Sequence, residues 1–382
     1  MFSKGRKRLI LTVSGRGTNG DSVPSFVEGE TITGRVGLEL DKAERNLTSV
    51  ELSIEGQIGN LGYMMESNPT FEHRQTLWNI SFGDPRAPQA APRQPSEPQV
   101  LAGKYSWDFS FSIPHQFHAV GFKVTGDSLV QKLPPTLSEG DRHVSYTIGV
   151  KIKRNTTFEP FYELTTPFVY TPRSEPKSFS LLRISAYREN APLNGPDLDP
   201  DGWKVFPPVQ ITGYDLQEFG RVDLSCTLAL ATPLSYTRGS VIPLMLELDS
   251  QDENALGARF ISSPYFPKIK FYRTLREDNE NVLSRRNNVL ATWSVAGTQH
   301  RPSQCRRMLY GEIKLPAALR PSFDLGDIFI KYMVGFENGA FAIERDINLF
   351  QTEVQIVTDY APGPRPLRYH RERTSIPAWP TG

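Results

Sequence analysis

The chain has 382 residues, of which 38% are hydrophobic and 22% are charged. Its 29 glycines are far fewer than the one in three that collagen needs, and its apolar content excludes a wholly disordered chain. The 43 basic and 42 acidic side chains nearly cancel, so no net field favours a nucleic acid as partner.

Two cysteines among 382 residues argue against a disulfide scaffold and favour a reducing compartment. No apolar run approaches the ~20 residues that cross a bilayer. The apolar stretch 9–13, which follows the first basic residues, is shorter than the core of a secretory signal. We therefore expect a cytoplasmic protein of two domains, because a domain has about 100–200 residues.

Apolar and polar residues alternate with a period of two in both halves of the chain. The clearest runs are 31–40, 50–58, 144–153, 222–230, 242–248 and 328–336. This period places one side of a strand in a core and the other in water. Two such sheets must pack their apolar faces together, so the pattern predicts an all-β fold of two antiparallel β-sandwich domains, immunoglobulin-like in architecture.

Helical periodicity is not evident anywhere. The most helix-compatible segment, Arg276–Asn288, is mostly polar and is interpreted as a loop. Asn338-Gly339 lies between two alternating runs, and both residues tolerate the positive φ that a two-residue hairpin turn requires.

Composition suggests the domain limits. Five prolines make 83–100 a flexible insertion in a first domain, residues 1–172. A second domain follows over 173–360, and a disordered tail rich in proline and arginine over 361–382. The segments Phe26–Thr33 and Tyr236–Pro243 resemble each other and precede similar strands, so two copies of one sandwich plan are predicted.

Motifs that elsewhere carry chemistry lack their structural context here. Gly15–Gly20 fits G-x-G-x-x-G, but a strand follows instead of the helix that a dinucleotide site needs. Asp197–Gly202 matches the opening of a calcium-binding loop, whose twelfth position is here Pro208. Cys226 falls on the apolar face of its strand, which favours a core thiol over a nucleophile. We predict no enzyme and no catalytic, metal or cofactor site.

A basic cluster precedes the first strand, and it is a candidate partner site. It consists of Lys4, Arg6, Lys7 and Arg8. One interpretation is a solvated terminus. The other is a cationic edge that binds phosphates on a partner or on a lipid.

Several segments together resemble the arrestin family, most closely its fungal arrestin-like members of the alpha-arrestin type. They are Phe26–Glu30 before Thr31–Leu40, Val50–Gly56, Phe109–Pro114, Leu133–Leu137, Val144–Arg154, Asp201–Trp203, Pro233–Leu248 and Gly311–Tyr332. The resemblance implies two β-sandwiches and a non-enzymatic adaptor. Such an adaptor binds cytoplasmic parts of membrane proteins and links them to endocytic and ubiquitin-dependent trafficking.

The resemblance also implies partners and a location. The partners are cytoplasmic tails of membrane proteins, a ubiquitin ligase with WW domains, and anionic lipid head groups. The location is the cytoplasm, with peripheral association to the plasma membrane or endosomes. WW domains bind Pro-Pro-x-Tyr, which is absent here; Pro366 and Tyr369 form the nearest match in the predicted tail. The alternative is a structural or adhesive β-sandwich module without a trafficking role.

Overall fold

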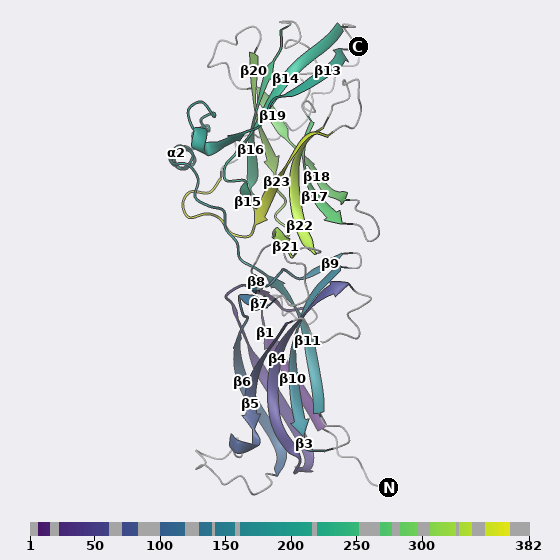
Figure 1. Cartoon of the computed structure of the whole chain (residues 1–382). Helices are drawn as coiled ribbons and strands as arrows, with labels where there is room; N and C mark the ends of the chain where they lie inside the picture. The colour runs from purple at the N-terminus through teal and green to yellow at the C-terminus, as the bar shows by residue number, and fades with distance from the viewer. Residues whose placement is uncertain are drawn as a thin grey trace, which may run out of the picture. The chain divides into compact units, whose positions relative to one another are not determined.

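The computed structural model divides the chain into two compact units, Met1–Pro172 with Leu325–Ile328, and Arg173–Asp324 with Phe329–Gly382. The described residues are 7–15, 23–60, 71–82, 100–118, 130–139, 142–156, 161–215, 220–251, 268–276, 283–295, 306–325, 328–337 and 348–366. Strands dominate both units (Figure 1), and almost all pairs are antiparallel. The predicted all-β sandwich fold is confirmed.

The first unit contains two main sheets. One has the order β1(Lys7–Ser14), β3(Thr31–Glu44), β6(Leu101–Ser112). The other has the order β2(Ser25–Val27), β11(Phe161–Thr171), β10(Arg142–Arg154), β4(Leu47–Asn60), β5(Phe71–Asn79), with β9(Leu137–Glu139) also on β10. The smaller elements are the pair β7(Gln116–His118) and β8(Val130–Lys132), and the 3-10 turn η1(Ile80–Phe82).

The second unit repeats this plan with additions. One sheet has the order β12(Trp203–Val205), β14(Gly220–Ala231), β16(Val241–Asp249), β20(Arg306–Lys314), β19(Thr292–Val295), with β13(Val209–Asp215) also on β14. The other has the order β15(Ser235–Thr237), β23(Asn348–Val357), β22(Phe329–Glu337), β17(Lys268–Arg276), β18(Leu283–Leu290), with β21(Phe323–Asp324) on β22. Helix α2(Leu181–Glu189) and the 3-10 turn η2(Pro200–Gly202) precede both sheets.

The period-two pattern corresponds to burial as expected. The apolar members of β10 are at most 1% exposed: Val144, Tyr146, Ile148, Val150 and Ile152. Opposite them in β4, Val50, Leu52 and Ile54 are fully buried. Burying each such side chain contributes about 1.5–3 kcal/mol, so these two central strands stabilise the first sandwich.

Matching hydrogen bonds show that the two sandwiches are copies of one plan. The hydroxyl of Tyr146 donates to the Pro134 carbonyl at 2.8 Å, and that of Tyr332 donates to the Arg320 carbonyl at 2.9 Å, each twelve residues earlier. In both units a short strand, β2 or β15, pairs in parallel with the last long strand. A glycine with positive φ follows each short strand, Gly29 at +84° and Gly239 at +78°.

Two details of the sequence interpretation are wrong. The segment Arg276–Asn288 is not a loop throughout, because residues 283–290 form strand β18 against β17. The absence of helix is also wrong, because Leu181–Glu189 is helical. That helix escapes a periodicity search because it buries Arg183 and leaves Leu181 84% exposed.

Other expectations lie partly or wholly outside the described residues. These are the turn at Asn338-Gly339, most of Gly15–Gly20 and the insertion up to residue 99. Of the predicted tail, residues 361–366 are described; Ala361 is buried, and Arg365 lies over the ring of Tyr360.

Candidate functional site

Comparison of the described strands of the two units shows a strand edge in the first unit that no described strand covers. The order β1-β3-β6 corresponds to β14-β16-β20, so β1 is the counterpart of β14. The outer edge of β14 is paired with β12 and β13. Among the residues that the structure describes, β1 pairs with β3 alone. Its outward N–H and C=O groups therefore form an edge that can accept another strand.

The core beside this edge is incomplete. Leu9 and Leu11 lie opposite Leu38 and Val36 of β3 and share their inward face. Val36 and Leu38 are at most 2% exposed, whereas the two β1 leucines are only half-buried. Apolar side chains that face inward yet remain partly wet gain free energy when a partner covers them.

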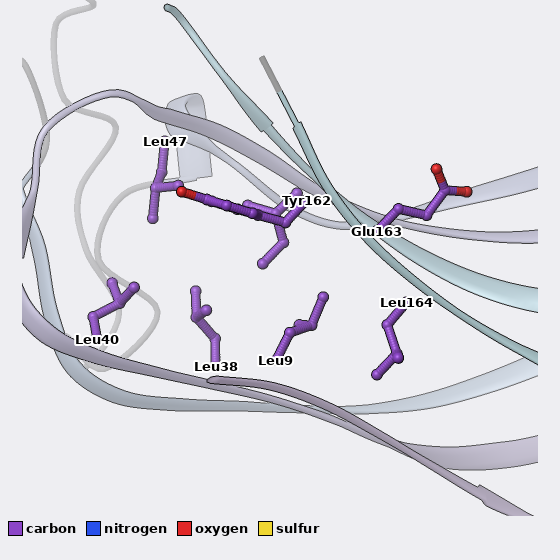
Figure 2. Close-up of a pocket in the computed structure, with 8 residues that line it drawn as sticks. Leu9, Leu38, Leu40, Leu47, Tyr162, Glu163 and Leu164 are labelled. Carbon is purple, nitrogen blue, oxygen red and sulfur yellow. The ribbon is translucent and has the colours of Figure 1, made fainter. Parts of the chain in front are cut away.

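An apolar pocket of about 230 Å³ opens in this region, between the two sheets of the first unit. Its lining residues are Leu9, Leu38, Leu40, Leu47, Ile152, Tyr162, Glu163 and Leu164. Figure 2 shows Leu9 and Leu38 on one side and Tyr162 on the other, with the carboxylate of Glu163 pointing away from the cavity. Leu164 of β11 is 36% exposed, although it pairs with the fully buried Val150.

Tyr162 is held in place by a polar cluster behind it. Arg154 donates from Nη1 to the Tyr162 hydroxyl and from Nη2 to Glu44 Oε2, both at 3.0 Å. The guanidinium carbon lies 5.2 Å from the centre of the Tyr162 ring. Arg154 and Glu44 are each mostly buried, which strengthens the ion pair relative to an exposed one. The pocket therefore has a rigid aromatic wall, suited to an aliphatic or aromatic side chain.

The predicted basic cluster lies at the start of β1, in part. Arg8 is exposed and sits opposite Glu39. A hydrogen bond from Lys104 at 2.9 Å and, less strongly, the charge of Arg8 lower the pKa of Glu39. Lys7 is paired with Leu40 in the register, and Lys4 and Arg6 lie outside the described residues. The positive charge of Arg8 is thus partly compensated on its own sheet.

The other predicted partner residues belong to the tail. Pro366 is half-buried at the end of the described chain, in the second unit, and Tyr369 lies outside the described residues. Their role in partner binding stays a prediction.

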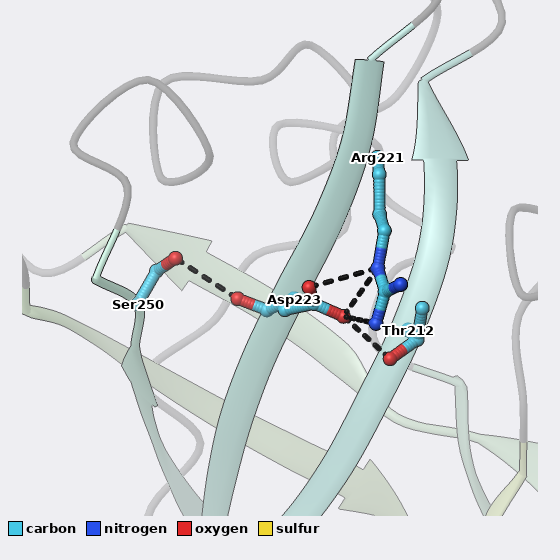
Figure 3. Close-up of polar contacts among 4 residues, drawn as sticks. All are labelled: Thr212, Arg221, Asp223 and Ser250. Carbon is cyan, nitrogen blue, oxygen red and sulfur yellow. Dashed lines mark hydrogen bonds and ion pairs between the residues drawn. The ribbon is translucent and has the colours of Figure 1, made fainter.

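A polar cluster of Thr212, Arg221, Asp223 and Ser250 lies on the second unit (Figure 3). Thr212 donates to Asp223 Oδ1 at 2.5 Å, and Arg221 donates through Nε to Oδ2 at 3.0 Å. Ser250 donates to the Asp223 carbonyl at 2.9 Å. The Thr212 hydrogen bond, followed by the Arg221 pair, lowers the pKa of Asp223. Thr212 and Asp223 are direct cross-strand partners on an exposed surface, so this cluster serves β13–β14 pairing.

Among the described residues, no group of three or more His, Cys, Asp or Glu side chains could hold a metal ion. The helices in this part of the chain lack the length and apolar character that crossing a membrane requires.

Sequence reasoning missed the pocket. Leu9 and Leu164 are apolar residues at inward positions of their strands. Consecutive apolar residues also occur in β16, which is paired on both edges, so the run from Leu9 to Leu11 does not distinguish β1.

Comparison with known proteins gives a family match within the first unit. Residues 19–166 match the family model of the arrestin (or S-antigen) N-terminal domain. Among the curated proteins, no sequence matches this chain. Among solved structures, the sporulation control protein Spo0M from Bacillus subtilis is 10% identical, with 66% of this chain and 81% of that chain covered. The TM-score of this match is 0.22. Residues 19–166 are therefore similar to the arrestin N-terminal domain.

Proposed function

We propose that this protein is an arrestin-like adaptor that holds an extended segment of a membrane protein's cytoplasmic part on the free edge of β1. The observation that carries the proposal is the uncovered β1 edge beside an apolar pocket, where the second unit has strands of its own. The arrestin domain of residues 19–166 supports an adaptor role, because arrestin-family proteins are non-enzymatic adaptors.

Strand addition explains how such an edge recognises its cargo. An added segment pairs its backbone with β1, and every second side chain faces the core. The inward side chain nearest the pocket enters the space between Leu9 and Leu164. Backbone pairing supplies affinity for any extended chain, and the pocket selects segments with an apolar residue at one position.

Basic residues near the start of β1 would contribute to binding of the cargo. Lys7 and Arg8 begin β1, and Lys4 and Arg6 precede them in the sequence; together these four charges would add attraction for phosphorylated segments or anionic lipid head groups. Their replacement by alanine is expected to reduce the salt dependence of binding.

Delivery of cargo to endocytic and ubiquitin-dependent trafficking would follow from recruitment of a ubiquitin ligase through Pro366 and Tyr369. Titration of the peptide 362–373 with a WW domain tests that step.

The experiment compares two substitutions on β11. The full chain is tested for binding to an array of peptides from cytoplasmic tails of membrane proteins. Leu164→Glu places a carboxylate in the pocket and is expected to weaken binding at least about tenfold, because a buried unpaired charge costs more than 1.4 kcal/mol. Val169→Glu is the control, since Val169 is 38% exposed on the same strand but lies outside the pocket lining.

The outcomes separate the proposal from its alternatives. Tail binding that is lost with Leu164→Glu and retained with Val169→Glu supports it. Equal loss with both variants, or no tail binding at all, contradicts it. Capture of partners exclusively at the cell exterior would favour an adhesive module.

A further inference from the structure

We propose that, when no cargo is bound, the β1 edge pairs with β1 of a second copy of this chain, about a twofold axis at Leu11. The inference rests on the proposed function, because it names what occupies the same edge before cargo arrives. It makes cargo binding and self-association mutually exclusive.

The composition of β1 distinguishes it from an ordinary protected edge. Proteins usually protect edge strands with charges. Strand β5 follows that rule, with Glu72 and Arg74 forming an ion pair at the edge of the other sheet. After Arg8, β1 has no charged residue through Ser14. The segment Leu9–Ser14 is therefore an uncharged part of the edge, which readily pairs with another such segment.

Self-complementarity of β1 fixes the most favourable register. In an antiparallel pair centred on Leu11, Leu9 lies opposite Val13 of the second copy, and Leu11 lies opposite its own counterpart. All of these positions are on the inward face in the observed pairing with β3. Each copy thus extends the inner apolar row of the other. A pairing register that placed inward residues of one copy opposite outward residues of the other would leave the inner apolar row of each β1 in contact with water.

Charge supports the same register. Arg8 faces Ser14 of the second copy, and position 7 faces Gly15, so no two cations lie opposite each other. Like charges directly opposite are destabilising in an antiparallel pair.

The geometry limits the assembly to two copies. In a twofold pair each β1 uses the edge of the other, so no edge of this kind remains for a third copy. The added strand also lies beside Leu9 and covers the half-buried inward residues of β1. Cargo and the second copy need the same outward N–H and C=O groups of β1. A cargo segment whose apolar side chain fills the pocket therefore displaces the second copy.

The first test uses charge at an exposed position. Ser14 is exposed, so its substitution leaves the core unchanged. Ser14→Asp puts a carboxylate opposite Arg8 twice per dimer and is expected to lower the dissociation constant of the dimer about two- to thirty-fold. Ser14→Lys puts a cation there and is expected to raise it. Sedimentation of the full chain over a range of concentrations measures both.

The second test reads the register directly. Residues directly opposite have Cα atoms about 4.5–5.5 Å apart, within the range of a disulfide. In a Cys305→Ser background, Leu11→Cys is expected to form a covalent dimer with itself under mild oxidation. Leu9→Cys and Val13→Cys are expected to cross-link when mixed and not alone. Cys226 is buried and serves as the internal control.

The results distinguish this inference from the proposed function. A chain that stays monomeric, with no response to the Ser14 variants and no Leu11→Cys cross-link, overturns self-pairing. If that monomer still binds tail peptides, the proposed function survives alone. A dimer that responds as described and binds no tail peptide supports self-pairing and contradicts the cargo role. Addition of a binding peptide is expected to dissociate the dimer, and a peptide bound without dissociation overturns their exclusivity.

Discussion

Gly34 illustrates, at the scale of a residue, how closely β3 supports β1. A Cβ atom at Gly34 would stand 2.1 Å from the Thr12 carbonyl oxygen and 2.6 Å from Cζ of Phe109. Neither the Thr12 backbone nor the packed Phe109 ring can move aside without a cost in free energy. Gly34→Ala is therefore expected to lower the free energy of unfolding of the first unit by about 1–3 kcal/mol. Gly37→Ala is the matched control, because its Cβ would lie an ordinary 3.6 Å from Ile10. Chemical denaturation of both variants measures the difference, and equal stability would contradict the close approach.

Cys226 gives a prediction about pH. Burial, followed by the charge of Asp249, raises the pKa of its thiol to about 12. An unfolded thiol ionises near pH 8.5. The stability due to the protonated thiol is therefore present below about pH 8.5 and declines as the pH rises toward about 12.

Thiol modification followed by mass spectrometry tests this prediction. Native Cys226 is expected to resist iodoacetamide between about pH 7 and 10, because the thiolate is the reactive form. In denaturant the same residue is expected to react readily near pH 8.5. Modification of the native protein at the denatured rate would show that the thiol is accessible and ionised.

The sequence could predict Cys226 as a core residue because the alternation of its strand is regular. It could not predict the role of Leu9 or Leu164. Both are apolar residues at expected inward positions, and only the fold shows that their side chains remain partly exposed.

Helix α2 depends, at the scale of an element, on a buried arginine. Arg183 is 3% exposed, donates from Nε to the Tyr187 hydroxyl at 3.0 Å and from Nη1 to the Thr232 carbonyl, and lies 4.3 Å from the centre of the Phe179 ring. Ser180 caps the helix by accepting from the Arg183 N–H. Nine residues with exposed leucines at the start would not be helical alone.

Replacing this arginine is expected to release the helix. Arg183→Met retains much of the aliphatic stem but leaves the Thr232 carbonyl without its donor, which costs about 1–3 kcal/mol. Hydrogen exchange of residues 181–189 is expected to accelerate. Arg188→Met, on the exposed side of the same helix, is the control and is expected to change nothing. Unchanged exchange in Arg183→Met would show that other contacts hold α2.

The elements that sequence reasoning misjudged share one physical cause. Burial of Arg183 in α2 and pairing of the polar strand β18 with β17 are tertiary effects, in which a neighbour satisfies groups that local pattern assigns to solvent. The strands with regular alternation needed no such information, since one buried face suffices to define them.

Duplication is the organising feature of the whole molecule, and it was partly predictable. Phe26–Thr33 and Tyr236–Pro243 do occupy matching places, ahead of β3 and β16. The decisive difference between the copies was not predictable. Whether a strand edge is covered depends on the pairing of β12 and β13 with β14, and the pattern within a strand does not specify which strand it pairs with.

Two cores predict two unfolding events. The buried hydroxyls of Tyr146 and Tyr332 each hold a carbonyl twelve residues earlier. Tyr146→Phe is expected to lower the stability of the first unit by about 1 kcal/mol, and Tyr332→Phe that of the second by a similar amount. Calorimetry should show a different transition shifted in each variant. A single transition that both variants shift equally would show that the units unfold together.

The most direct test of the account measures hydrogen exchange along β1 as cargo binds. The chain is diluted until it is monomeric and mixed with a tail peptide that binds it. We expect the amides of β1 to gain protection, while those of the charged edge β5 keep their exchange rates. Binding that leaves β1 unchanged, or that protects another edge instead, would contradict the claim that β1 receives the partner.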